Sequence, residues 1–363
     1  MMTTSQRQNA MPRRISLALA ALVIPRVAPM APALKDRAAP ALKDRAHVSY
    51  EEATRATWRS EKFWNAFCAG RDLERPELAR FQAFCDNLRD DRNVGVLTVE
   101  PSGRTVDEQY RFPGLDGADG ANAQNAAGLH EWMGGLCAAA ATAQRELEES
   151  LANVEGAPLS PDHLGGAATE RRGEVAQGAS AWNRMGWLGS QYLPLRSAPD
   201  AWARTTAALR RGGVPAGHRF CGISRQAAGC RGKVHSDHHN FVLSTLTPLR
   251  GCTAATGIEL DGAPTPLLDG AGGAPGATVV LDNTYDHVVY NDATSDAVDR
   301  FVLIVETWHP ALTNAEREAL SDLFALRDLF GLLEHKRAPF GISDEAATAL
   351  LDRGARLDDW RLL

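Results

Sequence analysis

The sequence predicts a mainly β fold with helical extensions on both sides. From about residue 181, short apolar runs alternate with turns rich in Gly, Pro, Asn and Asp, a spacing typical of the strands of β-sandwiches and β-barrels. Before and after this region, apolar residues recur at helical spacing between charged ones. We therefore expect a β core of the sandwich or barrel kind, preceded and followed by helices.

The expected strands of the core are short apolar runs that end at turn residues. They lie at 184–193, 219–224, 240–249, 252–259, 277–282, 286–290 and 299–307. The run from Arg300 to Trp308 is apolar almost throughout, and we expect it to be a central strand. An earlier strand is expected at 94–99, and a helix at 199–211 interrupts the series.

Helices are expected on either side of the core. Aromatic and apolar residues recur at roughly helical spacing over 47–90, and a stronger helical pattern covers 129–153. After the core the pattern is helical again, and Thr313 or Asn314 is a suitable N-cap for this helix. A second C-terminal helix is expected to begin near Ser343.

These patterns divide the chain into four regions. We expect residues 1–46 to be a targeting segment with a linker, 47–180 a mainly helical region, 181–312 the β core and 313–363 the C-terminal helices. Residues 154–180 have no apolar period and are rich in Gly, Ala and Glu, so this stretch is expected to be a flexible loop.

The N-terminal segment has the features of a signal or transit peptide. An apolar run at 15–24 follows Arg13 and Arg14, and it is too short for a membrane span but suits the core of a signal peptide. The octapeptide APALKDRA then occurs twice, at 31–38 and 39–46, which we interpret as a duplicated linker. The alternative is a disordered tail without a targeting role.

Composition excludes some classes of protein. The 39 Lys and Arg residues are outnumbered by 45 Asp and Glu residues, and the net charge of −6 gives no electrostatic basis for binding nucleic acid. The six cysteines form no CxxC pair, which argues against a zinc ribbon or a thioredoxin motif. Free or buried thiols are expected, and disulfides are the alternative if the protein is secreted.

Three residues have the types and spacing of an iron site. His235 and Asp237 lie two apart in Val-His-Ser-Asp-His-His, so on an extended segment both side chains point the same way. His287 follows 52 residues later, at a turn between two apolar runs. Two histidines and one carboxylate form the facial triad of non-haem Fe(II) oxygenases, which leaves coordination positions open for a cosubstrate and O2.

Other interpretations of these residues exist. A His-x-Asp pair recurs by chance in long chains, and Asp237 could instead stabilise the turn that follows it. The neighbouring His238 and His239 could be ligands of a structural zinc site. The presence of a distant histidine and an arginine in the same β-rich half favours the iron site.

That arginine is Arg300, thirteen residues after His287 at the start of an apolar run. An arginine on a buried strand must be paired. A dicarboxylate cosubstrate would supply the pair, because one end could chelate iron while the distal carboxylate receives the guanidinium group. The alternative is a structural salt bridge to a carboxylate of the protein.

Three stretches of the core share their sequence with a known family. They are Val234–Leu243, Leu281–His287 and Arg300–Thr313, and the last, which ends in Trp-His-Pro-Ala-Leu-Thr, is the most specific. Together with Phe112–Leu115, which reads FPGL, they resemble the aspartyl/asparaginyl β-hydroxylases. The resemblance is centred on residues 181–320.

This resemblance implies a double-stranded β-helix, the cupin-like jelly roll, and a hydroxylation coupled to oxidative decarboxylation of 2-oxoglutarate. By position, it makes His235 and His287 ligands of Fe(II), and it makes Arg300 and Ser224 contacts of 2-oxoglutarate. Ser224 lies eleven residues before His235, which is the spacing expected for the family's cosubstrate serine.

The chain departs from the animal members that modify EGF-like domains. Those enzymes have Gly where this chain has Asp237, and they have Arg and His where it has Ser244 and Leu246. We therefore expect an Fe(II)/2-oxoglutarate dioxygenase acting on an aspartyl/asparaginyl-type peptide or amino acid, but not on EGF-like domains. The alternatives are a lipid acyl-chain hydroxylase of the same family and a degenerate cupin that binds without turnover. No membrane span is expected in the mature chain.

Overall fold

The fold is described from a computed structural model. The described residues are 50–69, 71–115, 124–125, 130–152, 190–195, 202–294, 299–335 and 337. The chain divides into two units, Met1–Pro40 and Ala41–Leu363, and all described residues belong to the second. The predicted targeting segment, the loop expected at 154–180 and the helix expected near Ser343 lie outside the described residues.

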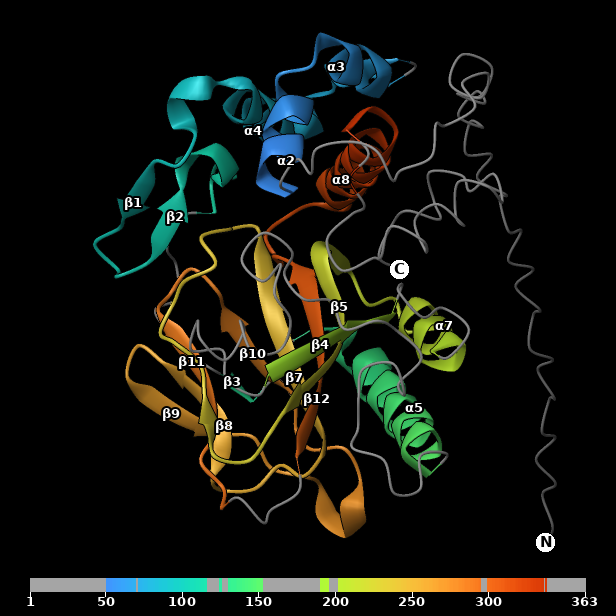
Figure 1. The fold of residues 1–363 in the computed structure, drawn as a ribbon. Coiled ribbons are helices and arrows are strands. Elements are labelled where there is room, and N and C mark those ends of the chain that lie inside the picture. Colours follow the sequence, from blue (N-terminus) through green and yellow to red (C-terminus); the bar gives the residue numbers. More distant parts are fainter. Residues whose placement is uncertain are drawn as a thin grey trace, which may run out of the picture. The chain divides into compact units, whose positions relative to one another are not determined.

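Two antiparallel sheets form the core of the described part (Figure 1). The larger sheet has the order β3-β10-β7-β12-β5-β4 and the smaller one β6-β11-β8-β9. The larger sheet consists of β3 (Gln124–Asn125), β4 (Ser190–Pro194), β5 (Ala216–Gln226), β7 (Val242–Arg250), β10 (Val279–Asp282) and β12 (Arg300–Trp308). The smaller sheet consists of β6 (Cys230–Arg231), β8 (Thr256–Leu260), β9 (Ala263–Pro266) and β11 (His287–Asn291). A separate hairpin joins β1 (Leu97–Val99) to β2 (Thr105–Asp107).

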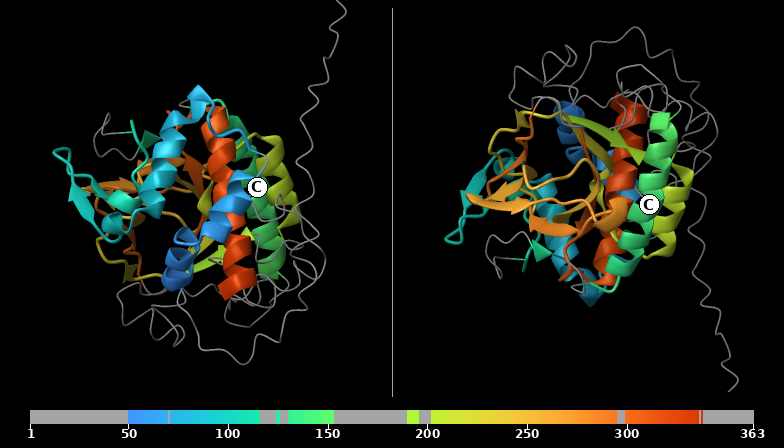
Figure 2. Two further views of the ribbon diagram at one scale, coloured as in Figure 1. Left: turned by 90° about the horizontal axis from the view of Figure 1, so that it is seen from above. Right: turned by 90° about the horizontal axis from the view of Figure 1, so that it is seen from below.

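Helices flank the larger sheet in two groups (Figures 1 and 2). One group contains α2 (Tyr50–Trp58), α3 (Glu61–Cys68), α4 (Ala79–Arg89) and α8 (Asn314–His335). Its aromatic side chains form a core with the end of the larger sheet, where Phe241 and Trp308 pack against Phe324. The other group, α5 (Met133–Ala152) and α7 (Ala203–Arg211), covers one face of the same sheet.

The strand β12 is central, as its apolar sequence predicts, since it pairs with both β5 and β7. Its side chains alternate between two cores, as they must in a pleated strand. Leu303 and Val305 pack under α5 and α7, whereas Val302 and Ile304 pack between the two sheets. From Arg300 to Glu306, the residues of β12 with even numbers therefore face the smaller sheet.

The prediction of a mainly β fold with flanking helices is confirmed. The short strands β2, β3, β6 and β9 were not expected, and each has four residues or fewer. Within the described residues the two sheets do not join into one closed barrel. The double-stranded β-helix therefore stays a prediction, and so do the proposed domain boundaries.

Helix α8 begins at the expected position. The hydroxyl of Thr313 accepts from the N–H of Glu316 at 3.2 Å, while the carboxylate of Glu316 accepts from the N–H of Thr313 at 2.8 Å. This reciprocal pair is a capping box, so Thr313 is the N-cap. None of the described helices has the length and apolar character needed to cross a membrane. All six cysteines are free thiols, as expected.

Candidate active site

A pocket of about 90 Å³ lies between the inner faces of the two sheets. His235, Asp237 and His287 all line it. The rest of the wall combines apolar and charged side chains. The apolar ones are Phe220, Leu246, Ile258, Leu281, Val289 and Ile304, and the charged ones, apart from Asp237, are Arg219 and Glu306.

The two predicted histidine ligands lie side by side. His235 and His287 form an antiparallel bridge, with N–H to carbonyl distances of 3.0 and 2.8 Å in the two directions. Directly opposed residues of an antiparallel pair project to the same side. The imidazole ring centroids are consequently 4.4 Å apart.

Backbone carbonyls fix the tautomer of both imidazoles. Nδ1 of His235 is 2.8 Å from the carbonyl of Lys233, and Nδ1 of His287 is 3.0 Å from the carbonyl of Tyr285. A carbonyl only accepts, so each Nδ1 must carry the proton and donate. Nε2 is then the nitrogen with the lone pair in both rings, the arrangement that metal-binding histidines use.

Asp237 lines the same pocket, but its carboxylate is paired with an arginine. Oδ2 of Asp237 lies 3.0 Å from Nη2 of Arg219. Within the described residues, no three His, Cys, Asp or Glu side chains are placed so that together they could hold a metal ion. The structure thus brings together the two histidines of the predicted triad, and the triad with Asp237 stays a prediction.

The histidines of the alternative zinc site make separate contacts. Nδ1 of His238 lies 3.2 Å from the carbonyl of Thr105, and Nδ1 of His239 lies 3.1 Å from Nη1 of Arg219. Burial lowers the pKa of His239 well below its ordinary value, and Arg219 lowers it further. A neutral His239 accepts the hydrogen bond from Arg219.

Arg300 is buried between the sheets, with 1% of its surface exposed. Its Nη1 donates to the carbonyls of Gly257 and Tyr290, both at 3.1 Å, while its buried Nε has no partner among the described residues. Burial lowers the pKa of Arg300, and the groups that oppose this shift are Cys252, Tyr192 and Tyr290. None of these is a carboxylate, so the described residues provide no salt bridge for Arg300.

Ser224 lies near Arg300 on the same face of the larger sheet. It pairs across the sheet with Val302 on one side and Tyr192 on the other, and it is 2% exposed. Tyr192 lines the pocket, whereas Ser224 and Arg300 do not. The two predicted cosubstrate contacts therefore lie on the inner face of the sheet but outside the pocket wall.

Two charged residues of the pocket were missed by the sequence reasoning, namely Arg219 and Glu306. Nη2 of Arg219 lies 3.1 Å from Oε1 of Glu306, which is 3% exposed. A signal for Glu306 did exist, since it lies six residues after Arg300 on one strand and so shares its face. Nothing comparable in the sequence singled out Arg219.

Ser244 and Leu246, two of the three positions identified above as departures, also line the pocket. Ser244 and Leu246 lie on β7, where they pair across the sheet with Glu306 and Ile304. The hydroxyl of Ser244 accepts a hydrogen bond from Nδ2 of Asn283 at 2.7 Å. These residues therefore contribute a small hydroxyl and an apolar surface to the pocket.

Comparison with known proteins identifies a family that this part of the chain resembles. Residues 141–310 match the family model of the aspartyl/asparaginyl beta-hydroxylases. The resemblance to this family is thereby confirmed. The match covers slightly less than half of the chain and includes all five predicted site residues. No curated protein matches the chain.

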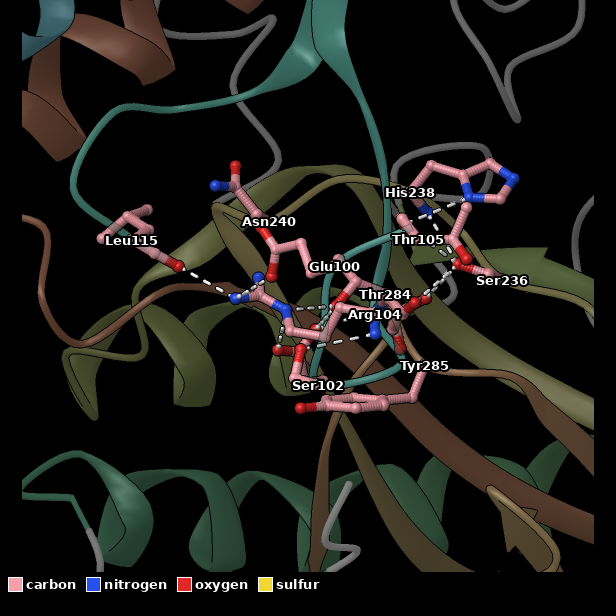
Figure 3. Close-up of polar contacts among 12 residues, drawn as sticks. Glu100, Ser102, Arg104, Thr105, Leu115, Ser236, His238, Asn240, Thr284 and Tyr285 are labelled. Carbon is pink, nitrogen blue, oxygen red and sulfur yellow. Dashed lines mark hydrogen bonds and ion pairs between the residues drawn. The ribbon is translucent and has the colours of Figure 1, made fainter. Parts of the chain in front are cut away.

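Within the segment that matches the family model, Ser236 links the two backbone segments that carry the histidines (Figure 3). Its hydroxyl lies 2.9 Å from the carbonyl of Thr284, to which it donates, and 3.4 Å from the carbonyl of Thr105. Ser236 lies between His235 and Asp237, so its side chain points away from theirs on the extended segment. It fixes the ligand-bearing segment from behind.

Arg104, from the β1–β2 hairpin, reinforces this arrangement (Figure 3). Its Nε donates to the hydroxyl of Thr284 at 2.7 Å and lies 3.3 Å from Oδ2 of Asp282, while its Nη1 donates to the carbonyl of Leu115 at 3.0 Å. The side chain of Arg104 is 3% exposed, so these bonds are shielded from water. The hairpin thus fastens the turn that precedes His287.

Proposed function

We propose that this protein is an Fe(II)- and 2-oxoglutarate-dependent hydroxylase. The observation that carries the proposal is the pair of His235 and His287, which face one pocket with both Nδ1 atoms held by carbonyls. This pair lies in the segment that matches a hydroxylase family. Such fixed imidazoles are characteristic of metal ligands rather than of surface histidines.

The side chains in the pocket suit Fe(II). His235 and His287 would each provide Nε2, and Asp237 would provide a carboxylate oxygen after exchanging its contact with Arg219. Two imidazoles and one carboxylate are the donors that non-haem Fe(II) oxygenases use. When bound, iron, 2-oxoglutarate and O2 together would supply the oxidising power to hydroxylate a C–H bond.

The buried charges suit a dicarboxylate cosubstrate. Arg219 and Arg300 carry two positive charges, while Asp237 and Glu306 carry two negative ones, so these four side chains sum to zero. A divalent cation and a dianion that bind together preserve that neutrality, whereas either alone leaves two uncompensated charges in a region of low dielectric. The Nε of Arg300, which has no partner in the part of the chain that the structure describes, is a donor that one carboxylate could satisfy.

The chain's own residues contribute positioning and exclusion of water. The apolar side chains that line the pocket, including Leu246 and Ile258, limit the water that reaches the histidines. Ser236 and Arg104 hold the two histidine segments in register. This rigidity keeps the donor atoms in place before any ligand binds.

The proposed substrate is an aspartyl- or asparaginyl-type peptide or a free amino acid. The basis for this choice is the family match. Two alternatives remain for the test. One is hydroxylation of a lipid acyl chain, which the apolar wall of the pocket favours, and the other is ligand binding without turnover, which Ser244 and Leu246 favour because neither carries a positive charge.

The experiment is a pair of measurements on the full chain. Anaerobic titration with Fe(II) and then 2-oxoglutarate should show sequential binding, and admission of O2 should produce succinate. His287→Ala should abolish Fe(II) binding, and Arg231→Ala on the surface should not. Binding without succinate for any peptide, amino acid or lipid offered would favour the binding module, and absence of Fe(II) binding by folded protein would refute the proposal.

A further inference from the structure

Glu306 is a buried carboxylate at the wall of the pocket that the proposed chemistry does not use. It lies on β12, faces the smaller sheet, and is 3% exposed. Its strand neighbours on this face are apolar, and its cross-strand partner is Ser244. A carboxylate in such a place must be compensated by a cation, because burying an unpaired charge is strongly unfavourable.

One nitrogen of Arg219 compensates two carboxylates at once. Nη2 lies 3.0 Å from Oδ2 of Asp237 and 3.1 Å from Oε1 of Glu306. The side chains of the arginine, the aspartate and the glutamate are 20%, 14% and 4% exposed, so all three are largely shielded from solvent. Two acids therefore compete for one guanidinium group at close range.

The other arm of Arg219 is fixed. Its Nη1 donates to Nδ1 of His239 at 3.1 Å, and the His239 ring in turn packs edge-on against Tyr110, with ring centroids 4.6 Å apart. The guanidinium group is therefore anchored at one nitrogen while the other is shared. A small movement of Asp237 would leave Arg219 paired with Glu306, without exposing the positive charge.

We propose that Glu306 is a positioning residue that controls how readily Asp237 takes a divalent cation. When Asp237 turns to the cation, Glu306 keeps the guanidinium group of Arg219 neutralised, which lowers the cost of breaking the Arg219–Asp237 pair. Arg219 in turn prevents Glu306 from becoming a further ligand. This inference rests on the proposed function, because it assumes that Asp237 is a ligand.

The proposal predicts opposite effects for two substitutions. Glu306→Gln removes one of the two carboxylates that lie within 3.1 Å of Nη2. Asp237 is then held more tightly, and cation affinity should fall about tenfold, the lower end of the effects seen for outer partners of metal ligands. Arg219→Gln removes the competing positive charge and should raise cation affinity by a similar factor. A residue that only supports the fold would produce losses in both cases.

The experiment uses Co(II) as the probe, with affinity measured by calorimetry on the full chain. The visible absorption of bound Co(II) reports its coordination number, and it should change in Arg219→Gln as Glu306 joins the ligands. The matched control is Arg225→Gln, which removes an arginine of the same strand that pairs with Asp299 away from the pocket. Circular dichroism verifies the fold of each variant.

The outcomes separate the two levels of inference. The proposal is supported if Co(II) affinity falls in Glu306→Gln, rises in Arg219→Gln and does not change in Arg225→Gln. If Co(II) affinity changes in the same direction in Glu306→Gln and Arg219→Gln, or changes in neither, the proposal is overturned while the proposed function stays intact. If Arg219→Gln does not fold, Arg219→Lys replaces it and should give a smaller rise, because an ammonium group holds Asp237 less firmly than the guanidinium fork. Folded wild type that binds no Co(II) overturns both.

Discussion

Replacing Arg300 by methionine should separate the stability of the fold from cosubstrate binding. The substitution removes two charge-assisted hydrogen bonds, to the carbonyls of Gly257 and Tyr290. At about 1.5–3 kcal/mol each, their loss costs about 3–6 kcal/mol. It also removes a buried cation that has no carboxylate beside it among the described residues, and relief of that desolvation returns several kcal/mol. The free energy of unfolding should therefore change by less than about 2 kcal/mol.

Binding of 2-oxoglutarate should respond much more strongly. If Arg300 receives one carboxylate of the cosubstrate, loss of a single charged hydrogen bond of about 1.5–3 kcal/mol raises the dissociation constant at least about tenfold. Fe(II) binding should be unchanged, since Arg300 does not line the pocket with the histidines. Arg300→Ala should weaken cosubstrate binding as much as Arg300→Met does, and the cavity that it leaves should lower stability further.

The assay compares urea unfolding with anaerobic 2-oxoglutarate titration for the same proteins. Arg231→Met is the matched control, because Arg231 is 44% exposed and its ion pairs with Glu259 and Asp292 lie at the surface. Surface pairs of this kind contribute about 0–1 kcal/mol, so the free energy of unfolding and the 2-oxoglutarate affinity should both stay close to those of wild type. A marked loss of stability in Arg300→Met with unchanged cosubstrate affinity would refute the reasoning and assign Arg300 a purely structural role.

Three further predictions concern other parts of the site and the core. Asp237→Ala and Asp237→Gly should both lower Fe(II) affinity. If both variants bind Fe(II) as tightly as wild type while His235→Ala loses Fe(II) binding, the site is a two-histidine site. Ser236→Ala should cost about 1 kcal/mol of stability and weaken Fe(II) about tenfold, measured by unfolding and titration; unchanged Fe(II) affinity would exclude a positioning role. Burial raises the pKa of Cys252 to about 12, so its thiol stays protonated at mildly alkaline pH. Iodoacetamide should therefore modify the exposed Cys137 first. Peptide mass mapping measures the order of labelling, and early labelling of Cys252 would contradict the prediction.

The long apolar strands could be predicted because their signal is local. The run 299–307 lies within one residue of β12, and the runs 240–249 and 277–282 likewise overlap β7 and β10. The strands β6 and β9 gave no such signal. The first has two residues, and the second has the sequence Ala-Pro-Thr-Pro with mostly exposed side chains at the edge of its sheet. Such strands exist because a neighbour pairs with them, and pairing between distant segments is not a local property of the sequence.

The candidate site divides in the same way. His235 and His287 could be found from residue type and position, since each lies near the end of an apolar run. Arg219 could not, because the register of β5 against β12 is irregular beside it. Val305 pairs with Cys221, but Thr307, two residues on, pairs with Ala216, so 217–220 are displaced from regular pairing. Bulges of this kind redirect side chains near functional sites.

That irregularity has a consequence for the interpretation of Asp237. A carboxylate two residues after a histidine is predicted to turn toward the same ion, and Asp237 does line one pocket with His235 and His287. The irregular segment of β5, however, brings a guanidinium group to within 3.0 Å of the same carboxylate. The spacing of the sequence therefore decides where Asp237 points, while charge decides its partner. A divalent cation carries twice the charge of Arg219, and Glu306 remains to neutralise the arginine, so the exchange is electrostatically favoured once a cation enters.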